Sequence, residues 1–106
     1  MPAGNRGATV RRISVAEAVE ITQARAALEG LIARLAAERG TEAEREDLRA
    51  LLADMTEAVA EGDSLSYSKL NRRLHGSLCT IARHRVADDL VANLRNRAAH
   101  HQFRLA

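Results

Sequence analysis

Two side chains one helical turn apart, Asn71 and His75, have the spacing of a ligand or metal site. Residues at i and i+4 lie on one face of a helix, so both side chains can reach the same point. An imidazole nitrogen is a good ligand for a borderline metal ion, whereas a neutral amide is weaker than the carboxylate of an Asp–His pair. The alternative is structural, because a single histidine in a helical bundle is usually satisfied at a helix boundary.

Arg25 interrupts the apolar half of a helical segment, beside Ala24 and one turn before Leu28. Its planar guanidinium can donate two hydrogen bonds to one carboxylate, a geometry that lysine cannot match. Alternatively, it extends to solvent or pairs with Glu29 at i+4. Both interpretations stay open on the residues alone.

The remaining reactive residue types have structural explanations. Cys79 is the single cysteine, so an internal disulfide or a cysteine-based metal cage is excluded, and its apolar surroundings predict a buried small side chain. His100 and His101 diverge by about 100° on a helix, which predicts surface positions. No acid, base and nucleophile converge, so we expect no enzyme.

Charge patterning argues against a nucleic-acid surface. The net charge is +2, and residues 41–61 hold seven acidic side chains against two arginines. An acidic segment in the middle of the chain does not form a surface that binds the phosphate backbone of a nucleic acid. The acidic run Glu42–Asp47 fits a solvated helix start, and Arg72 and Arg73 are expected on a solvated flank.

Composition predicts one all-α domain. Only Tyr67 and Phe103 are aromatic and Pro2 is the single proline, so the core must come from Leu, Ile, Val and Ala. We find neither a membrane-length apolar stretch nor a signal peptide, and we expect a cytoplasmic protein.

Two capping boxes place the first two helices. Ser14 with Glu17 opens a helix of about 25 residues that ends before Gly40. Thr41 with Glu44 opens a second, which Gly62 ends, and the short connection predicts antiparallel neighbours. The positions predicted to face inward are Ile21, Ala24, Leu28, Leu31 and Leu35, then Leu48, Leu52, Met55 and Val59.

Asp63 or Ser64 can cap a third helix, which Arg83–Arg85 interrupts. A fourth runs from about Val86 towards Phe103 without a stop signal. The predicted inward positions are Tyr67, Leu70, Leu74, Leu78 and Ile81, then Leu90, Val91, Leu94 and Ala98. The sequence thus predicts an antiparallel bundle of four helices.

Several of these segments resemble a known family. The run ISVAEAVEITQARAALEGLIARLAAERGT resembles the first long helix of the FadR-type C-terminal domain, FCD, of bacterial GntR-type transcription regulators. Its matching features are Arg25, Leu28-Glu29, the Ala-rich stretch 35–39 and Thr41. The helix ending in Glu61-Gly62-Asp63 and the segment from Tyr67 to His75 are similar to the next two helices. Arg6–Arg11 resembles the last wing strand and linker of a preceding winged-helix domain.

The resemblance implies that residues 13–106 are part of a six- or seven-helix antiparallel bundle, and that residues 1–12 are a linker or wing remnant. Such domains form homodimers, bind a small carboxylate effector and control DNA binding by an attached winged helix, which this chain lacks.

The resemblance also makes Arg25, Asn71 and His75 ligand-binding positions. Many members hold a divalent metal such as Zn²⁺ or Ni²⁺ through one Asp and three His. Asn71 and His75 would form an incomplete metal site, because Asn71 replaces the Asp and the other two histidines belong to helices beyond residue 106. The alternative function is a truncated helical dimerisation module that captures a partner subunit without a ligand.

Overall fold

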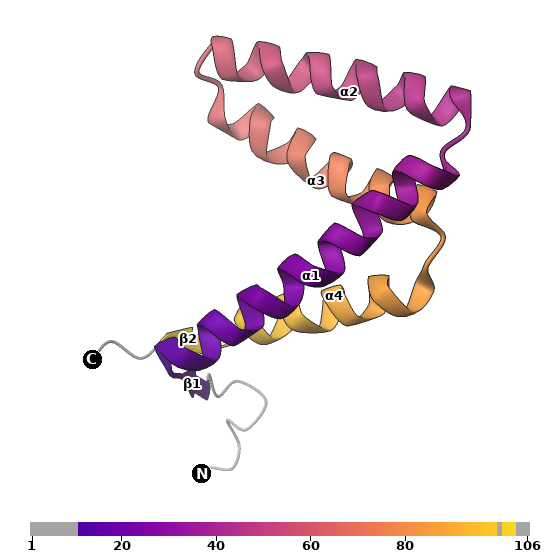
Figure 1. The fold of residues 1–106 in the computed structure, drawn as a ribbon. Coiled ribbons are helices and arrows are strands. Elements are labelled where there is room, and N and C mark those ends of the chain that lie inside the picture. The colour runs from indigo at the N-terminus through magenta and orange to yellow at the C-terminus, as the bar shows by residue number, and fades with distance from the viewer. Residues whose placement is uncertain (1–10, 100, 104–106) are drawn as a thin grey trace, which may run out of the picture.

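The computed structural model describes residues 11–99 and 101–103, which form four helices and two short strands. Figure 1 shows the helices α1 (Val15–Arg39), α2 (Glu42–Ala60), α3 (Ser64–Ala82) and α4 (Arg85–Ala99). The strands β1 (Arg11–Ile13) and β2 (His101–Phe103) pair in parallel, with Arg11 opposite His101. The predicted all-α class is confirmed, and the two-stranded ladder is an addition to it.

The predicted helix starts are made by local hydrogen bonds. The Ser14 hydroxyl accepts from the backbone N–H of Glu17 at 3.0 Å. Thr41 and Glu44 form the complete capping box, with bonds of 3.1 and 2.9 Å. Asp63 caps α3, and Gly62 before it has a φ of +68°, a conformation that favours glycine. These caps satisfy N–H groups that a helix start leaves unpaired.

The break between α3 and α4 falls within the predicted interruption. Arg83 ends α3 in the left-handed conformation, with φ 53°. His84 then caps α4, because its Nδ1 accepts from the backbone N–H of Ala87 at 3.0 Å. The fourth helix therefore begins at Arg85, one residue before the predicted Val86.

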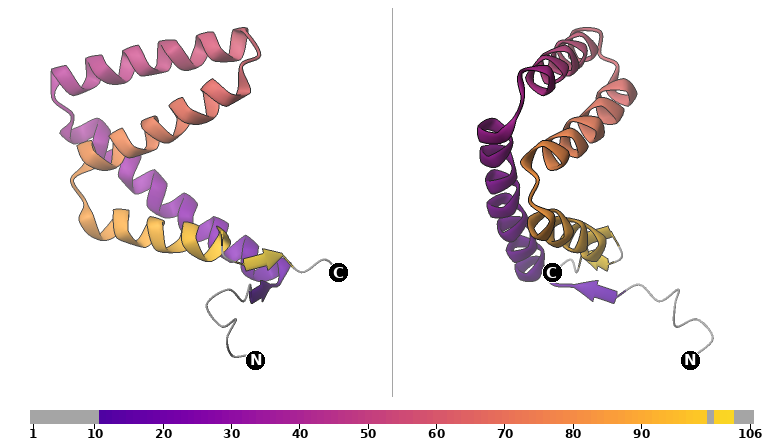
Figure 2. Two further views of the ribbon diagram at one scale, coloured as in Figure 1. Left: turned by 180° about the vertical axis from the view of Figure 1, so that it is seen from behind. Right: turned by 90° about the vertical axis from the view of Figure 1, so that its right-hand side faces the viewer.

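The core lies where α1, α3 and α4 meet. α1 packs against both α3 and α4, whereas α2 packs against α3. The predicted antiparallel packing of α2 along α1 is wrong: Figure 2 shows α2 leaving the end of α1 and running beside α3. The buried residues of the core cluster are Ile32, Leu35, Ala36, Ile81, Ala82, Ala87 and Val91.

Part of each predicted apolar face is exposed, so the prediction is wrong at these positions, and in α2 this follows from its packing against α3 instead of α1. Leu52 and Val59 of α2 are 49% and 64% exposed, and α2 buries Leu51, Met55 and Ala58 instead. α2 packs against α3 on one side only, so its buried residues form a narrow face of the helix. Among the other residues predicted inward, Ala24, Tyr67 and Leu90 are exposed as well.

The predicted continuation of the fourth helix towards Phe103 is also wrong. α4 ends at Ala99, and residues 101–103 pair with β1 near the start of α1. Ile13 of β1 is 2% exposed, so this short strand contributes a buried apolar side chain. The predicted linker lies mostly outside the described residues, as does the expectation for His100.

The molecule is elongated, at 54 × 34 × 28 Å, with a radius of gyration of 17.1 Å. A compact domain of this length would have a radius of about 13 Å. The α2–α3 hairpin extends away from the α1–α4 pair, which accounts for the difference (Figures 1 and 2). No described helix is long and apolar enough to cross a membrane.

The His84 cap gives a stability prediction. His84→Ala removes the acceptor for the Ala87 N–H and should cost about 1 kcal/mol. That corresponds to a fall of roughly 4–8 °C in Tm, measured by thermal unfolding followed by circular dichroism. His84→Ser keeps a capping oxygen and should recover most of the loss, so equal losses in both variants would contradict the capping role.

Candidate functional site

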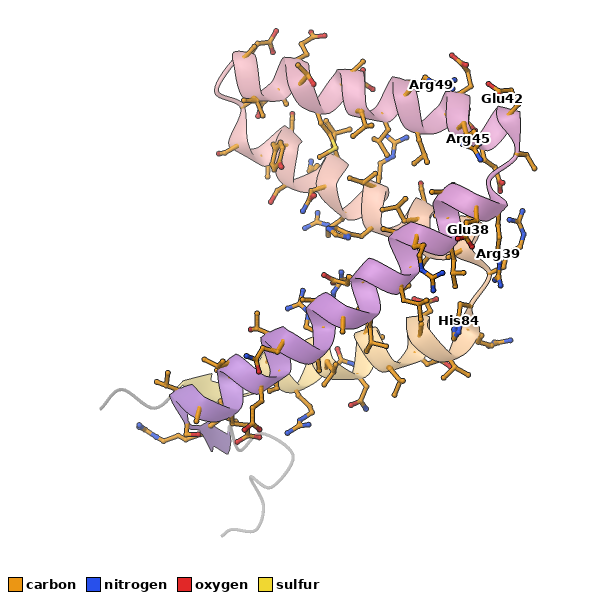
Figure 3. All side chains as sticks on the ribbon, in the orientation of Figure 1. Glu38, Arg39, Glu42, Arg45, Arg49 and His84 are labelled. Carbon is orange, nitrogen blue, oxygen red and sulfur yellow. The ribbon has the colours of Figure 1, made fainter. Side chains whose placement is uncertain are left out.

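The carboxyl ends of α1 and α3 are joined by two arginines that cap each other's helix. Nη1 of Arg39 donates to the carbonyl oxygens of Ala82 at 2.6 Å and Arg83 at 3.2 Å. Nη1 of Arg83 donates to the carbonyl oxygens of Ile81 at 2.8 Å and Arg39 at 3.4 Å. Figure 3 shows Arg39 at this end of the molecule, with His84 below it. Four carbonyl oxygens at these two helix ends thereby gain a donor.

From this junction α1 and α3 diverge towards their amino ends, as Figure 1 shows. On α1, Arg25 and Glu29 lie at helical spacing in line with the buried residues Ile32 and Ala36. Arg25 is therefore on the core-facing side of α1, but on the order of 20 Å from the junction, at 1.5 Å per residue.

Asn71 and His75 occupy the matching side of α3. Both lie at helical spacing in line with Leu78 and Ala82, of which Ala82 is fully buried and Leu78 packs against the core. Both are half-buried, as is Arg25. Within the described residues, however, no hydrogen bond or ion pair joins Arg25 to either of them. The three candidates thus share the inner sides of two diverging helices without direct contact.

Arg25 is instead engaged with Glu29, the structural alternative that the sequence offered. Its Nη2 lies 3.4 Å from Oε2 of Glu29, and Nη2 of Arg95 on α4 donates to the same oxygen at 3.0 Å. Nε of Arg25 is buried and has no hydrogen-bond partner within the described residues. Burial raises the pKa of Glu29, but the hydrogen bond from Arg95 and the charge of Arg25 outweigh it, so the pKa is lowered overall. Glu29 therefore stays ionised between two arginines.

Asn71 and His75 alone do not fit a metal ion. A structural zinc site takes four nitrogen or sulfur ligands, and a catalytic one at least three. No group of three His, Cys, Asp or Glu side chains that could hold a metal occurs among residues 11–99 and 101–103. An amide and one imidazole on a half-buried helix face leave most coordination positions unfilled.

Cys79 belongs to the packing and not to a reactive site. The side chain packs against the core cluster as predicted, but it is half-buried and not fully buried. Burial and the neighbouring Asp88 carboxylate raise the pKa of its thiol to about 11. At neutral pH the nucleophilic thiolate is therefore a very small fraction.

Two open hollows lie between α2 and α3, on a different side of α3. The larger, of about 520 Å³, is lined by Glu44, Asp47, Leu48, Arg73, Gly76, Ser77, Thr80 and Ile81. Arg73 also lines the second, of about 470 Å³. Arg73 is about 160° around the helix from His75, at 100° per residue. These hollows are therefore separate from the face that carries the candidates. Arg72 and Arg73 are both exposed, as predicted.

Arg95 is the residue of this network that sequence reasoning missed. It lies 66 positions after Glu29, so no local spacing links the two. The sequence gives only a weak indication of this role. Arg95 is four residues after Val91, on the predicted inner side of the fourth helix, where a charged side chain needs a partner. Only the packing of α4 against α1 identifies that partner.

A comparison with protein families connects these features to a known domain. Residues 20–106 match the family described as the FCD domain, which includes all four helices except the first turn of α1. No curated protein and no solved structure matches the chain. FCD domains are regulatory ligand-binding parts of transcription regulators and not a catalytic family. Because the match covers most of the sequence, this chain belongs to the FCD domain family.

Proposed function

We propose that this chain is the effector-sensing and dimerisation domain of a bacterial, cytoplasmic GntR-type transcription regulator, and that it binds a small carboxylate metabolite at Arg25. The supporting observation is that the Arg25 guanidinium is partly buried and uses only some of its hydrogen-bond donors. It lies on the core-facing side of α1, two-thirds buried, with one long contact to Glu29 and a buried Nε that has no partner among residues 11–99 and 101–103. An incoming carboxylate supplies the acceptors that this donor group lacks.

Asn71 and His75 are proposed as the polar contacts on the opposite helix. They lie on the inner side of α3, where amide and imidazole groups can hydrogen-bond the rest of an organic acid. A ligand bound by both helices favours one angle between them over others. That preference is transmitted as a population shift to an attached winged helix-turn-helix domain, which makes the DNA contacts.

A divalent metal, Zn²⁺ or Ni²⁺, is a secondary proposal and needs ligands beyond the described residues. His75 supplies one imidazole, and Asn71 the neutral oxygen of an amide. Metal ions prefer a carboxylate in that position, because its charge offsets that of the cation. We therefore assign no step of effector binding to a metal.

The carboxylate proposal predicts ligand-dependent stabilisation. Succinate, gluconate or citrate at 100 times its Kd should stabilise the fold by about 2.7 kcal/mol, seen as a rise in Tm. Arg25→Ala should abolish the rise, and His75→Ala should reduce it. Zn²⁺ and Ni²⁺ in the same assay test the metal, whose effect His75→Ala should remove. Arg34→Ala, which removes an exposed arginine from the same helix, is the control. A well-folded wild-type protein that responds to none of these acids would contradict the proposal.

A dimerisation module without a ligand is the second candidate, and the exposed apolar side chains favour it. Val59, Leu65 and Tyr67, at the connected ends of α2 and α3, are 64%, 68% and 39% exposed. Val59 and Tyr67 line an apolar hollow of about 260 Å³ there. Exposed apolar groups that gather in one place are typical of interaction surfaces. Such a module would capture a partner subunit through this hairpin.

The second candidate predicts self-association that does not depend on any small molecule. Tm should rise with protein concentration, and sedimentation should show a dimer, because association stabilises the folded state by mass action. Leu65→Lys should weaken the dimer, whereas Ala53→Lys, at an exposed position of α2, should not. A monomer at all accessible concentrations would contradict this function.

A further inference from the structure

Glu29 is positioned like a ligand of the proposed site. One of its carboxylate oxygens, Oε2, lies 3.4 Å from Nη2 of Arg25 on its own helix and 3.0 Å from Nη2 of Arg95 on α4. The three side chains are between 29% and 43% exposed, so water weakens these contacts only in part. Two arginines from two helices thus already bind a carboxylate, which belongs to the protein.

The two contacts differ in quality. Charge-assisted bonds from arginine to a carboxylate are usually about 2.7–2.9 Å long and often paired. The bond from Arg95 approaches that length, whereas the contact from Arg25 is long and single. The i+4 position brings the Glu29 carboxylate to Nη2 of Arg25, and in the part of the chain that the structure describes Nε has no acceptor. Arg25 is therefore incompletely satisfied, and Glu29 is held mainly by Arg95.

The charge of Glu29 opposes a second anion beside it. Arg95 keeps Glu29 ionised, as its lowered pKa indicates. An effector carboxylate that takes both donors of Arg25 would lie within a few ångströms of that negative charge. Like charges at such a distance repel, and partial burial preserves much of the repulsion.

We propose that Glu29 is an internal competitor for the effector: it occupies Arg25 in the free protein, and an incoming carboxylate displaces it towards Arg95. This inference rests on the proposed carboxylate site and adds its regulation. Displacement strengthens the contact between α1 and α4 while the ligand occupies the inner side of α1. Glu29 thus lowers the affinity for the effector and couples its binding to the packing of α4.

The test is the affinity of Glu29→Gln for succinate, measured by isothermal titration calorimetry on the 106-residue chain. The amide keeps the shape of Glu29 and removes its charge, so succinate should bind about tenfold more tightly than to the wild type. Glu38→Gln is the matched control. Glu38 pairs with Arg34 at the same i,i+4 spacing on the same helix, 3.6 Å away, but is exposed. The control should change the affinity less than twofold.

Each outcome bears on the inference. Equal or weaker binding by Glu29→Gln overturns it, and so does an equal gain in Glu38→Gln, which would reflect net charge alone. A third outcome is that the wild type binds succinate, Arg25→Ala abolishes binding, and Glu29→Gln binds with the wild-type affinity. In that case the internal competitor is wrong while the proposed function stands. If neither the wild type nor Glu29→Gln binds succinate, gluconate or citrate, both proposals fail. Glu29→Ala removes the same charge and replaces the glutamine variant if that one does not fold.

Discussion

The mutual capping of α1 and α3 fixes the geometry on which the other features depend. A helix leaves its last carbonyl groups without partners, and here Arg39 and Arg83 each donate to the end of the other's helix. Small side chains beneath this junction, Ala36, Ala82 and Ala87, let three helices approach closely. From this fastened end, α1 and α3 separate towards their other ends, as Figure 1 shows.

The divergence of α1 and α3 explains why the region between them is apolar near the junction and polar further out. Close to the junction, α1 and α3 bury aliphatic side chains against each other and against α4. Further out, the same helix faces carry Arg25 on α1 and Asn71 and His75 on α3, all half-buried. Charged and amide groups on the core-facing side of a helix are costly unless they find partners. For Arg25 the partner is the carboxylate of Glu29 in the free protein and, as we propose, an effector carboxylate in the bound one.

In the α2–α3 hairpin, α2 is packed differently from the other helices. α2 begins with a complete capping box and is held by a narrow face of three buried residues, Leu51, Met55 and Ala58. The hairpin projects from the body, as Figure 2 shows. Val59, Leu65 and Tyr67 at its far end are exposed. Such an arm suits contacts with further helices or with a second subunit, because its apolar area is not covered by the described residues. On the functions we propose, effector binding and association would use separate parts of one chain.

Local rules determined the helices of this protein. Capping residues, glycines and apolar periodicity depend on neighbours within about four positions, so Ser14, Thr41, Gly62 and the Arg83–Arg85 break could be located from the sequence. The candidate site residues were singled out by their type and spacing and by the resemblance to a family, and in the structure they lie on the inner sides of two diverging helices. Sequence alone could not decide which apolar residues are buried, because that depends on which helices become neighbours.

Tertiary structure decided the rest, through contacts between distant positions. Leu52 and Val59 have the spacing of core residues, yet they are exposed. The reason is that α2 turns away from the carboxyl end of α1 and packs beside α3. Phe103 was expected in a helix, but pairing with β1 requires extended backbone in residues 101–103. Arg95 reaches Glu29 across 66 positions, which no local pattern encodes. Periodicity shows which face of a helix is apolar, but only the packing shows what covers that face, since burial depends on both partners.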